Sequence, residues 1–328
     1  MFFRHLIAVV SLVIANPAAS HDRLEVGFER QMMPDGTEIG IWYPASGTPK
    51  HQRLGLYAHD VIVGAEPAEG GHPLVVISHG TGGDFTGHVD TANALVRAGF
   101  VVAALTHQGD NWKDRSRATQ VERRPIALTG LITYMLTAWP SRSVIDKNRI
   151  GAFGFSSGGF TVLAAVGGRP DLSRFADHCA KHPVFFDCTL VKAQPDASSM
   201  QWPETTDERI RAIVVAAPAL GFTFDKAGLD RIRIPVQLWR ADDDQILPAP
   251  FYADAVRANL PRKPAFETVP RAGHFDFLAP CVDATVVPQI CQSAPGFDRL
   301  AFHERFNSEM VRFFKKKLTG RRSLRHHW

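Results

Sequence analysis

The sequence lacks several features that mark other classes of protein. Its 328 residues include only four cysteines, and no two of them form a C-x-x-C motif, which argues against a zinc site. The net charge is only +4, and no basic stretch is interleaved with aromatic residues, so a nucleic-acid-binding groove is not expected. With 45% hydrophobic and 21% charged residues, the chain can bury a full core.

The N-terminus has no apolar run long enough to cross a bilayer comfortably, and it has the features of a secretory signal peptide instead. Arg4 precedes an apolar core at residues 6–15, and small residues follow at 18–20. We therefore expect cleavage after Ser20, which leaves residues 21–328 without stable membrane insertion. An uncleaved membrane anchor is the alternative.

The four cysteines fall into two pairs that are local in sequence, Cys179 with Cys188 and Cys281 with Cys291. Short loops close most easily, so we expect disulfides within each pair. Disulfides persist in oxidising compartments, which agrees with export to the periplasm or the extracellular medium. A zinc site is the alternative, although the histidines near the first pair lack the spacing of zinc ligands.

Strands and helices alternate along most of the chain, which predicts an α/β fold with a mostly parallel central sheet and helices on both faces. A hairpin at residues 24–43 should add antiparallel edge strands, with one short strand near 54–57. Residues 169–208 interrupt the alternation, and we interpret them as a lid-like insertion in a single domain. The expected strands are 73–78, 100–105, 149–155, 210–216, 234–239 and 265–269, and the expected helices are 86–98, 125–138, 161–167, 249–259 and 297–317.

The central motif is Gly154-x-Ser156-x-Gly158, which stands between an expected strand and an expected helix. This order is typical of a nucleophile elbow, in which the serine occupies a sharp turn and its neighbours two residues away must lack side chains. The alternative is a plain structural turn. A serine hydroxyl needs a base to take its proton, and the base needs a carboxylate to orient it.

The expected base is His274, which follows the last expected strand on a glycine-containing loop. The expected acid is Asp244, because Ile246, Leu247 and Pro248 after it would anchor the next helix and fix its side chain inward. Asp225, Asp242 and Asp243 are the alternative acids. A calcium or magnesium site in this aspartate run is disfavoured, because consecutive side chains point in different directions.

Two backbone N–H groups should stabilise the oxyanion of the substrate. One belongs to Ser157, the residue after the nucleophile, and the other is expected from Thr81 in the loop after residues 73–78. A phosphate-binding reading of residues 80–83 is disfavoured, because no Lys-Ser/Thr follows the glycines.

These motifs resemble the α/β-hydrolase superfamily over most of the chain. Within it the sequence resembles the predicted dienelactone hydrolases related to platelet-activating-factor acetylhydrolase, and that resemblance implies an esterase or lipase acting on small acyl groups. True dienelactone hydrolase has a cysteine nucleophile where this chain has Ser156, and in the acetylhydrolases the acid follows the earlier strand, which keeps Asp225 open. The matching motifs are Trp42-Tyr43-Pro44, Ser78-His79-Gly80, residues 154–159, residues 244–248 and Gly273-His274-Phe275.

We therefore expect an exported serine ester hydrolase that acts on a small-molecule ester and needs neither a metal nor an organic cofactor. An amidase or peptidase with the same triad is one alternative. A non-catalytic binding protein on the same fold is another, although the complete set of serine, histidine and aspartate argues against it. The sequence leaves acyl specificity, alcohol specificity and oligomeric state open.

Overall fold

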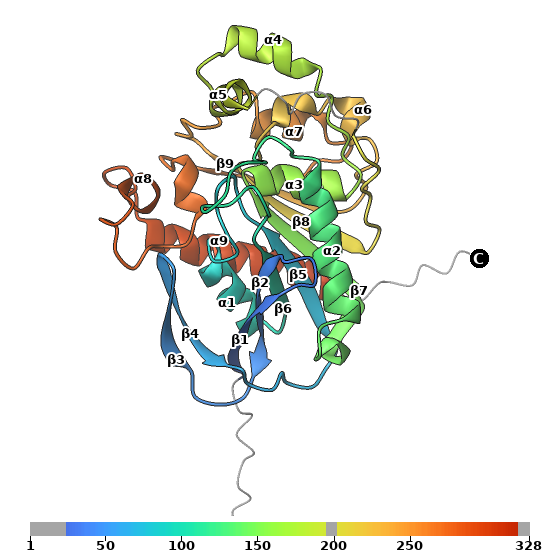
Figure 1. Cartoon of the computed structure of the whole chain (residues 1–328), viewed down its shortest axis with the longest axis vertical. Helices are drawn as coiled ribbons and strands as arrows, with labels where there is room; N and C mark the ends of the chain where they lie inside the picture. Colours follow the sequence, from blue (N-terminus) through green and yellow to red (C-terminus); the bar gives the residue numbers. More distant parts are fainter. Residues whose placement is uncertain (1–23, 195–201, 321–328) are drawn as a thin grey trace, which may run out of the picture.

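The structure is a computed structural model that describes residues 24–194 and 202–320. The expected signal peptide, residues 1–20, lies outside the described residues. A single sheet organises the chain, with the strand order β10-β9-β8-β7-β5-β6-β2-β1-β4-β3 (Figure 1). Its parallel part consists of β5 (His72–Ser78), β6 (Val101–Leu105), β7 (Ile145–Phe155), β8 (Ile210–Ala216), β9 (Val236–Ala241) and β10 (Ala265–Val269).

The inner strands are apolar along nearly their whole length because both faces of the sheet are covered. Alternate residues of β5 face opposite sides, so Leu74 and Val76 join one hydrophobic cluster while Val75 and Ile77 join the other. This two-sided burial is what a parallel sheet requires, and it confirms the predicted fold class.

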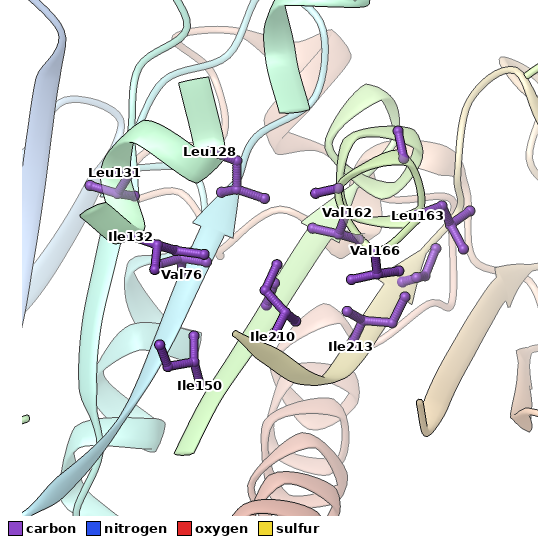
Figure 2. Packing of buried hydrophobic residues seen from close by; sticks show 14 of the residues in the cluster. Val76, Leu128, Leu131, Ile132, Ile150, Val162, Leu163, Val166, Ile210 and Ile213 are labelled. Carbon is purple, nitrogen blue, oxygen red and sulfur yellow. The ribbon is translucent and has the colours of Figure 1, made fainter. Parts of the chain in front are cut away.

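Two pairs of helices cover the two faces. α2 (Arg123–Thr137) and α3 (Ser157–Ala165) pack together on one face, and α1 (Val89–Arg97) and α9 (Arg299–Phe314) pack together on the other. Figure 2 shows the first face, where Leu128 and Ile132 of α2 lie over Val76, and Val166 at the end of α3 lies near Ile213. The rigid sheet thus fixes where the loops at the ends of its strands stand.

The N-terminal strands differ in part from the expectation. β1 (Glu25–Met32) and β2 (Glu38–Ala45) form the predicted hairpin, but β2 pairs with β6 and β1 pairs with β4 (Tyr57–Val63), so the hairpin lies inside the sheet. One short strand is expected near residues 54–57, whereas the structure has two there. β3 (Lys50–Leu54) and β4 form a hairpin, and the turn between them consists of Gly55, at a φ of +63°, and Leu56.

The segment 169–208 contributes α4 (Arg174–Lys181) and α5 (Phe186–Ala193), which Figure 1 shows beyond α3 at one end of the molecule. Residues 195–201 of this segment lie outside the described residues. The structure confirms both predicted cysteine pairs, since a disulfide joins Cys179 to Cys188 and another joins Cys281 to Cys291. The remaining helices are α6 (Lys226–Leu229), α7 (Ala253–Asn259) and α8 (Pro288–Cys291), and a π-helical turn at Lys315–Thr319 extends α9. Of the helices in the described ranges, none has the length and apolar character needed to span a membrane.

Candidate active site

Ser156 stands on a sharp turn between β7 and α3, with a φ of +56°. A Cβ atom at Gly154 would lie 1.9 Å from the carbonyl oxygen of Gly158, and one at Gly158 would lie 1.8 Å from the carbonyl oxygen of Ser78. Only glycine fits at both positions, which is the reason for the spacing of the motif. A non-glycine residue at positive φ costs on the order of 1–3 kcal/mol, so the surrounding packing must hold Ser156 in place.

The structure brings Ser156, His274 and Asp244 into one chain of hydrogen bonds. The Ser156 Oγ atom lies 3.0 Å from His274 Nε2, and His274 Nδ1 lies 2.7 Å from Asp244 Oδ2. All three residues are buried. A carboxylate offers only acceptors, so His274 Nδ1 donates to Asp244 and Nε2 is left to accept from the Ser156 hydroxyl.

Asp244 is held in position by its other oxygen. Its Oδ1 atom accepts the backbone N–H groups of Ile246 at 2.9 Å and of Leu247 at 2.7 Å. Burial alone raises the pKa of Asp244, but the interaction with His274 and these hydrogen bonds outweigh it, so that the pKa lies below the ordinary value. The carboxyl group is therefore ionised at neutral pH.

The other aspartates that the sequence left open lie elsewhere. The side chain of Asp225 caps α6 by accepting from the Gly228 N–H at 2.7 Å, and it pairs with Arg174 at 3.3 Å. Asp242 pairs with Arg240 at 2.7 Å, and Asp243 is exposed. Of the four aspartates, it is Asp244 whose carboxylate meets His274.

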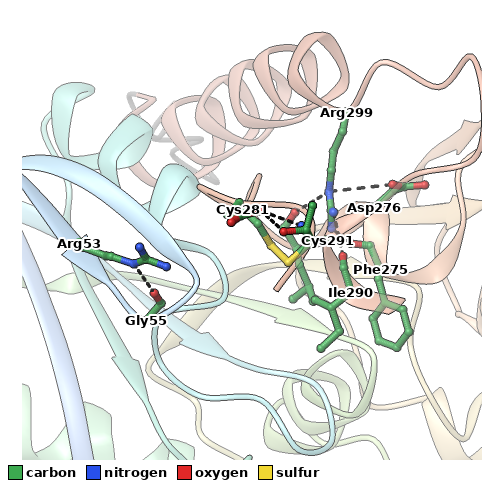
Figure 3. The surroundings of a disulfide bond; sticks show 11 residues. Arg53, Gly55, Phe275, Asp276, Cys281, Ile290, Cys291 and Arg299 are labelled. Atoms are coloured by element: carbon green, nitrogen blue, oxygen red, sulfur yellow. Dashed lines mark hydrogen bonds and ion pairs between the residues drawn. A yellow bond between two sulfur atoms is a disulfide. The ribbon is translucent and has the colours of Figure 1, made fainter. Parts of the chain in front are cut away.

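The loop that carries His274 is fixed from two sides. Asp276 accepts the Gly273 N–H at 2.8 Å and thereby closes the turn around the histidine. The buried Arg299 of α9 donates to the carbonyl oxygens of Phe275, Leu278 and Ile290. Figure 3 shows Arg299 between this loop and the Cys281–Cys291 disulfide. The disulfide-bonded segment and the histidine loop therefore share one anchor.

The residues expected to form the oxyanion hole lie side by side. Thr81 is in a turn that is closed by the Gly83 N–H and the Gly80 carbonyl at 3.1 Å, with Gly82 at a φ of +70°. Ser157 is the first residue of α3, so its N–H has no acceptor within the helix. The hydroxyl groups of Thr81 and Ser157 are 2.5 Å apart.

A buried ion pair that the sequence analysis missed connects these two positions. Arg124 pairs with Asp110, and both side chains are 3% exposed. Asp110 accepts the Gly82 N–H at 2.9 Å, and Arg124 donates to the carbonyl oxygen of His79. Arg124 also donates at 3.0 Å to the Thr161 hydroxyl, which donates at 2.7 Å to the carbonyl oxygen of Ser157.

The sequence does contain a signal for Arg124. It stands in the first turn of α2, where a positive side chain opposes the helix dipole. A cation at this end of a helix is unfavourable unless a specific partner compensates, and Asp110 is that partner.

A small cavity that is open to solvent, with about 60 Å³ of room for the centres of water-sized molecules, is lined by Thr81 and Ser157 and by residues of α5. Near it lies the one grouping of metal-binding residue types found in the described part of the chain, namely His178, Asp187 and Cys188. The sulfur of Cys188 is bonded to Cys179, so this grouping has only two groups left that can bind a metal.

Comparison with known proteins agrees with this architecture. The profile of the prolyl oligopeptidase family (peptidase family S9) matches residues 88–212, a range that includes Ser156 and ends before Asp244. Among curated proteins, no sequence matches. A solved structure of a ferulic acid esterase from Streptomyces cinnamoneus superposes with a TM-score of 0.63 over 95% of this chain and 94% of that one, at 19% sequence identity. The resemblance to the dienelactone hydrolases related to platelet-activating-factor acetylhydrolase stays a prediction, whereas the fold of this chain is that of the α/β-hydrolases.

Proposed function

We propose that this protein is an exported serine ester hydrolase that works through an acyl-enzyme intermediate, with Ser156 as nucleophile, His274 as base and Asp244 as the orienting acid. The observation that carries the proposal is the continuous hydrogen-bonded chain from Ser156 Oγ through His274 to Asp244, at 3.0 Å and 2.7 Å. The turn at Ser156, which has room for no side chain on either flanking glycine, supports the same assignment.

In the first half of the reaction, Ser156 Oγ attacks the ester carbonyl carbon while His274 Nε2 takes the hydroxyl proton. The imidazolium that forms is stabilised by the Asp244 carboxylate, which is already aligned with Nδ1. The developing oxyanion is received by the N–H groups of Thr81 and Ser157. His274 then gives its proton to the alcohol oxygen, the C–O bond breaks, and the alcohol leaves.

In the second half, water attacks the acyl group on Ser156 while His274 again takes a proton. The same two N–H groups stabilise the second tetrahedral intermediate, and collapse releases the acid and restores the Ser156 hydroxyl. Arg124 and Asp110 act in both halves as positioning residues, because they tie the Thr81 loop to the first turn of α3.

Export is part of the proposal. The apolar core at residues 6–15, with small residues before the expected cleavage at Ser20, supports a signal peptide. The two disulfides fit an oxidising destination, either the periplasm or the external medium. Expression of the full chain in a bacterium, followed by fractionation and N-terminal sequencing, tests this. A mature protein that begins at His21 is expected, and uncleaved protein in the cytoplasm would contradict it.

Amide hydrolysis is the second candidate function, and the match to the prolyl oligopeptidase family favours it. The esterase named in the structural comparison supports ester hydrolysis instead. A panel of p-nitrophenyl esters beside matched anilides, measured on the wild type and on Ser156→Ala, separates the two. We expect rapid ester turnover, slow anilide turnover and loss of both in the variant.

A non-catalytic binding protein would behave differently in the same assay. It would hydrolyse neither series, and a fluorophosphonate probe would leave Ser156 unlabelled in the folded protein. Labelling of the wild type together with no labelling of Ser156→Ala is the result that we expect.

A further inference from the structure

The cavity next to Ser157 is lined mostly by apolar side chains. Its lining includes Thr81 and Ser157, which are expected at the oxyanion hole, and α5 of the segment 169–208 supplies one wall. A substrate group that is joined to the reacting carbonyl can therefore extend from the serine toward α5. The main apolar residues are Val121, Leu172, Phe175, Leu190, Val191 and Leu220.

Asp187 is the one ionisable residue in this lining. It lies in the first turn of α5 and is 4% exposed. A buried carboxylate in an apolar wall is costly unless hydrogen bonds satisfy it. Its position is also fixed, because the next residue, Cys188, is bonded to Cys179 of α4.

The hydrogen-bonding capacity of Asp187 is only partly used within the described residues. The Tyr252 hydroxyl lies 3.0 Å from Oδ1 and 3.1 Å from Oδ2, and it has a single proton to donate. The backbone N–H of Cys188 donates to Oδ1 at 3.0 Å. A carboxylate can accept about four hydrogen bonds, so it can accept a further donor from a bound molecule. Burial raises the pKa of Asp187 although the Tyr252 contact opposes this.

We propose that Asp187 is a specificity residue, and that the cavity takes an apolar substrate group carrying a hydroxyl that hydrogen-bonds to Asp187. This inference rests on the proposed ester hydrolase and names the class of its substrate. A hydroxyl fits better than an ammonium group for two reasons. It costs less to remove from water into an apolar cavity, and it can donate to a carboxylate or accept from a protonated carboxyl group, whereas an ammonium group can only donate.

The first experiment measures binding without turnover. Ser156→Ala is titrated by calorimetry with methyl 3-(4-hydroxyphenyl)propionate and with the 4-methyl analogue, in which a methyl group replaces the hydroxyl. A second pair, methyl 6-hydroxyhexanoate and methyl heptanoate, makes the same comparison on a flexible chain. Hydrogen bonds to charged groups predict a preference for the hydroxyl of about 10-fold or more in Kd in at least one pair. No preference for the hydroxyl in either pair would overturn the proposal.

Variants then assign the preference to one side chain. In the Ser156→Ala background, Asp187→Leu should abolish or reverse it, and Asp187→Asn, which keeps the shape, should reduce it because a neutral acceptor is weaker. Tyr252→Phe is the matched control, since it removes a competing donor and should leave the preference equal or larger. A preference that survives both Asp187 substitutions in protein with a native circular dichroism spectrum would refute the role of Asp187.

Two further results separate this inference from the proposed function. If the wild type and Ser156→Ala turn over esters equally, the nucleophile is wrongly assigned, but the ratio of Kd values still tests Asp187. If Ser156→Ala is inactive and the ratio is unchanged by Asp187→Leu, this inference alone fails. An analogue with a 4-aminomethyl group should bind no more tightly than the hydroxyl analogue, and tighter binding would overturn the choice of a hydroxyl.

Discussion

Replacing Asp244 by asparagine tests the proposed mechanism at its most defined contact. The two oxygens of Asp244 have different partners, because Oδ1 accepts two backbone N–H groups and Oδ2 faces His274 Nδ1. In Asp244→Asn the carbonyl oxygen should keep the two backbone donors, which leaves the NH₂ group opposite His274. A donor at this place forces Nδ1 to become an acceptor, and Nε2 then carries the proton and faces Ser156.

The size of the effect follows from this reversal. The favoured tautomer cannot take the Ser156 proton, and the reactive tautomer would set two N–H groups against each other in a buried site. The imidazolium of the transition state would also lose a charge-assisted hydrogen bond of about 1.5–3 kcal/mol. The carboxylate-to-amide change in a serine–histidine–aspartate triad costs about 10⁴-fold in kcat, which corresponds to about 5.4 kcal/mol. We expect a loss of about 10³- to 10⁴-fold here, with KM nearly unchanged.

The assay is steady-state hydrolysis of p-nitrophenyl acetate at neutral pH, with active sites counted by a fluorophosphonate. Asp225→Asn is the matched control, because Asp225 caps α6 and pairs with Arg174 on the protein surface. It should retain near-wild-type kcat. The reasoning would be refuted if Asp244→Asn kept more than about a tenth of the wild-type kcat, or if Asp225→Asn lost as much of its kcat as Asp244→Asn does.

Three other predictions address the surroundings of the site. Removing either disulfide, Cys179–Cys188 or Cys281–Cys291, by paired serine substitutions should lower the free energy of unfolding by about 2.5–3 kcal/mol. Loss of Cys179–Cys188 should change kcat/KM for bulky esters more than for acetate esters, whereas loss of Cys281–Cys291 should lower kcat on all esters. Identical kinetic changes in the two variants would contradict the separate roles. Arg124→Lys cannot reach the same acceptors, so kcat should fall about 10²-fold with little change in KM, and an unchanged kcat would count against the positioning role. His59 is buried and accepts a hydrogen bond from Trp42, and burial lowers its pKa to about 4. The neutral His59 side chain therefore contributes on the order of 2–3 kcal/mol to the free energy of unfolding above pH 6.5, and this contribution is lost as the pH falls toward 4. Urea unfolding between pH 4 and 6.5 should show that the free energy of unfolding depends less steeply on pH in His59→Gln than in the wild type. Equal slopes in the two proteins would contradict this assignment to His59.

The parts of the site that sequence reasoning could reach are those with local causes. The spacing of Gly154, Ser156 and Gly158 reflects contacts within one turn, so it is visible in the sequence as it is in the structure. His274 and Asp244 follow strand ends, and parallel strands bring such ends to one edge of the sheet. The order of strands and helices was predictable for the same reason.

The parts that were missed depend on partners distant in sequence. Arg124 acts through Asp110, His79 and Thr161, which belong to three other segments. Asp187 could not be singled out because its hydrogen-bond partner, Tyr252, is 65 residues away in the sequence. The edge strand β3 is polar and largely exposed, so it has no apolar alternation from which it could be recognised.

The location of the two disulfides has a practical consequence for producing the protein. Neither bond lies within the central sheet: one ties α4 to α5 beside the cavity, and the other closes the segment that shares Arg299 with the histidine loop. Protein made in a reducing cytoplasm should therefore retain native spectra from its sheet and packed helices. The cavity wall at α5 and the loop that carries His274 should be less well ordered in it. Spectra would not reveal the missing disulfides in such a preparation, and its measured substrate profile would reflect the reduced protein rather than the native one.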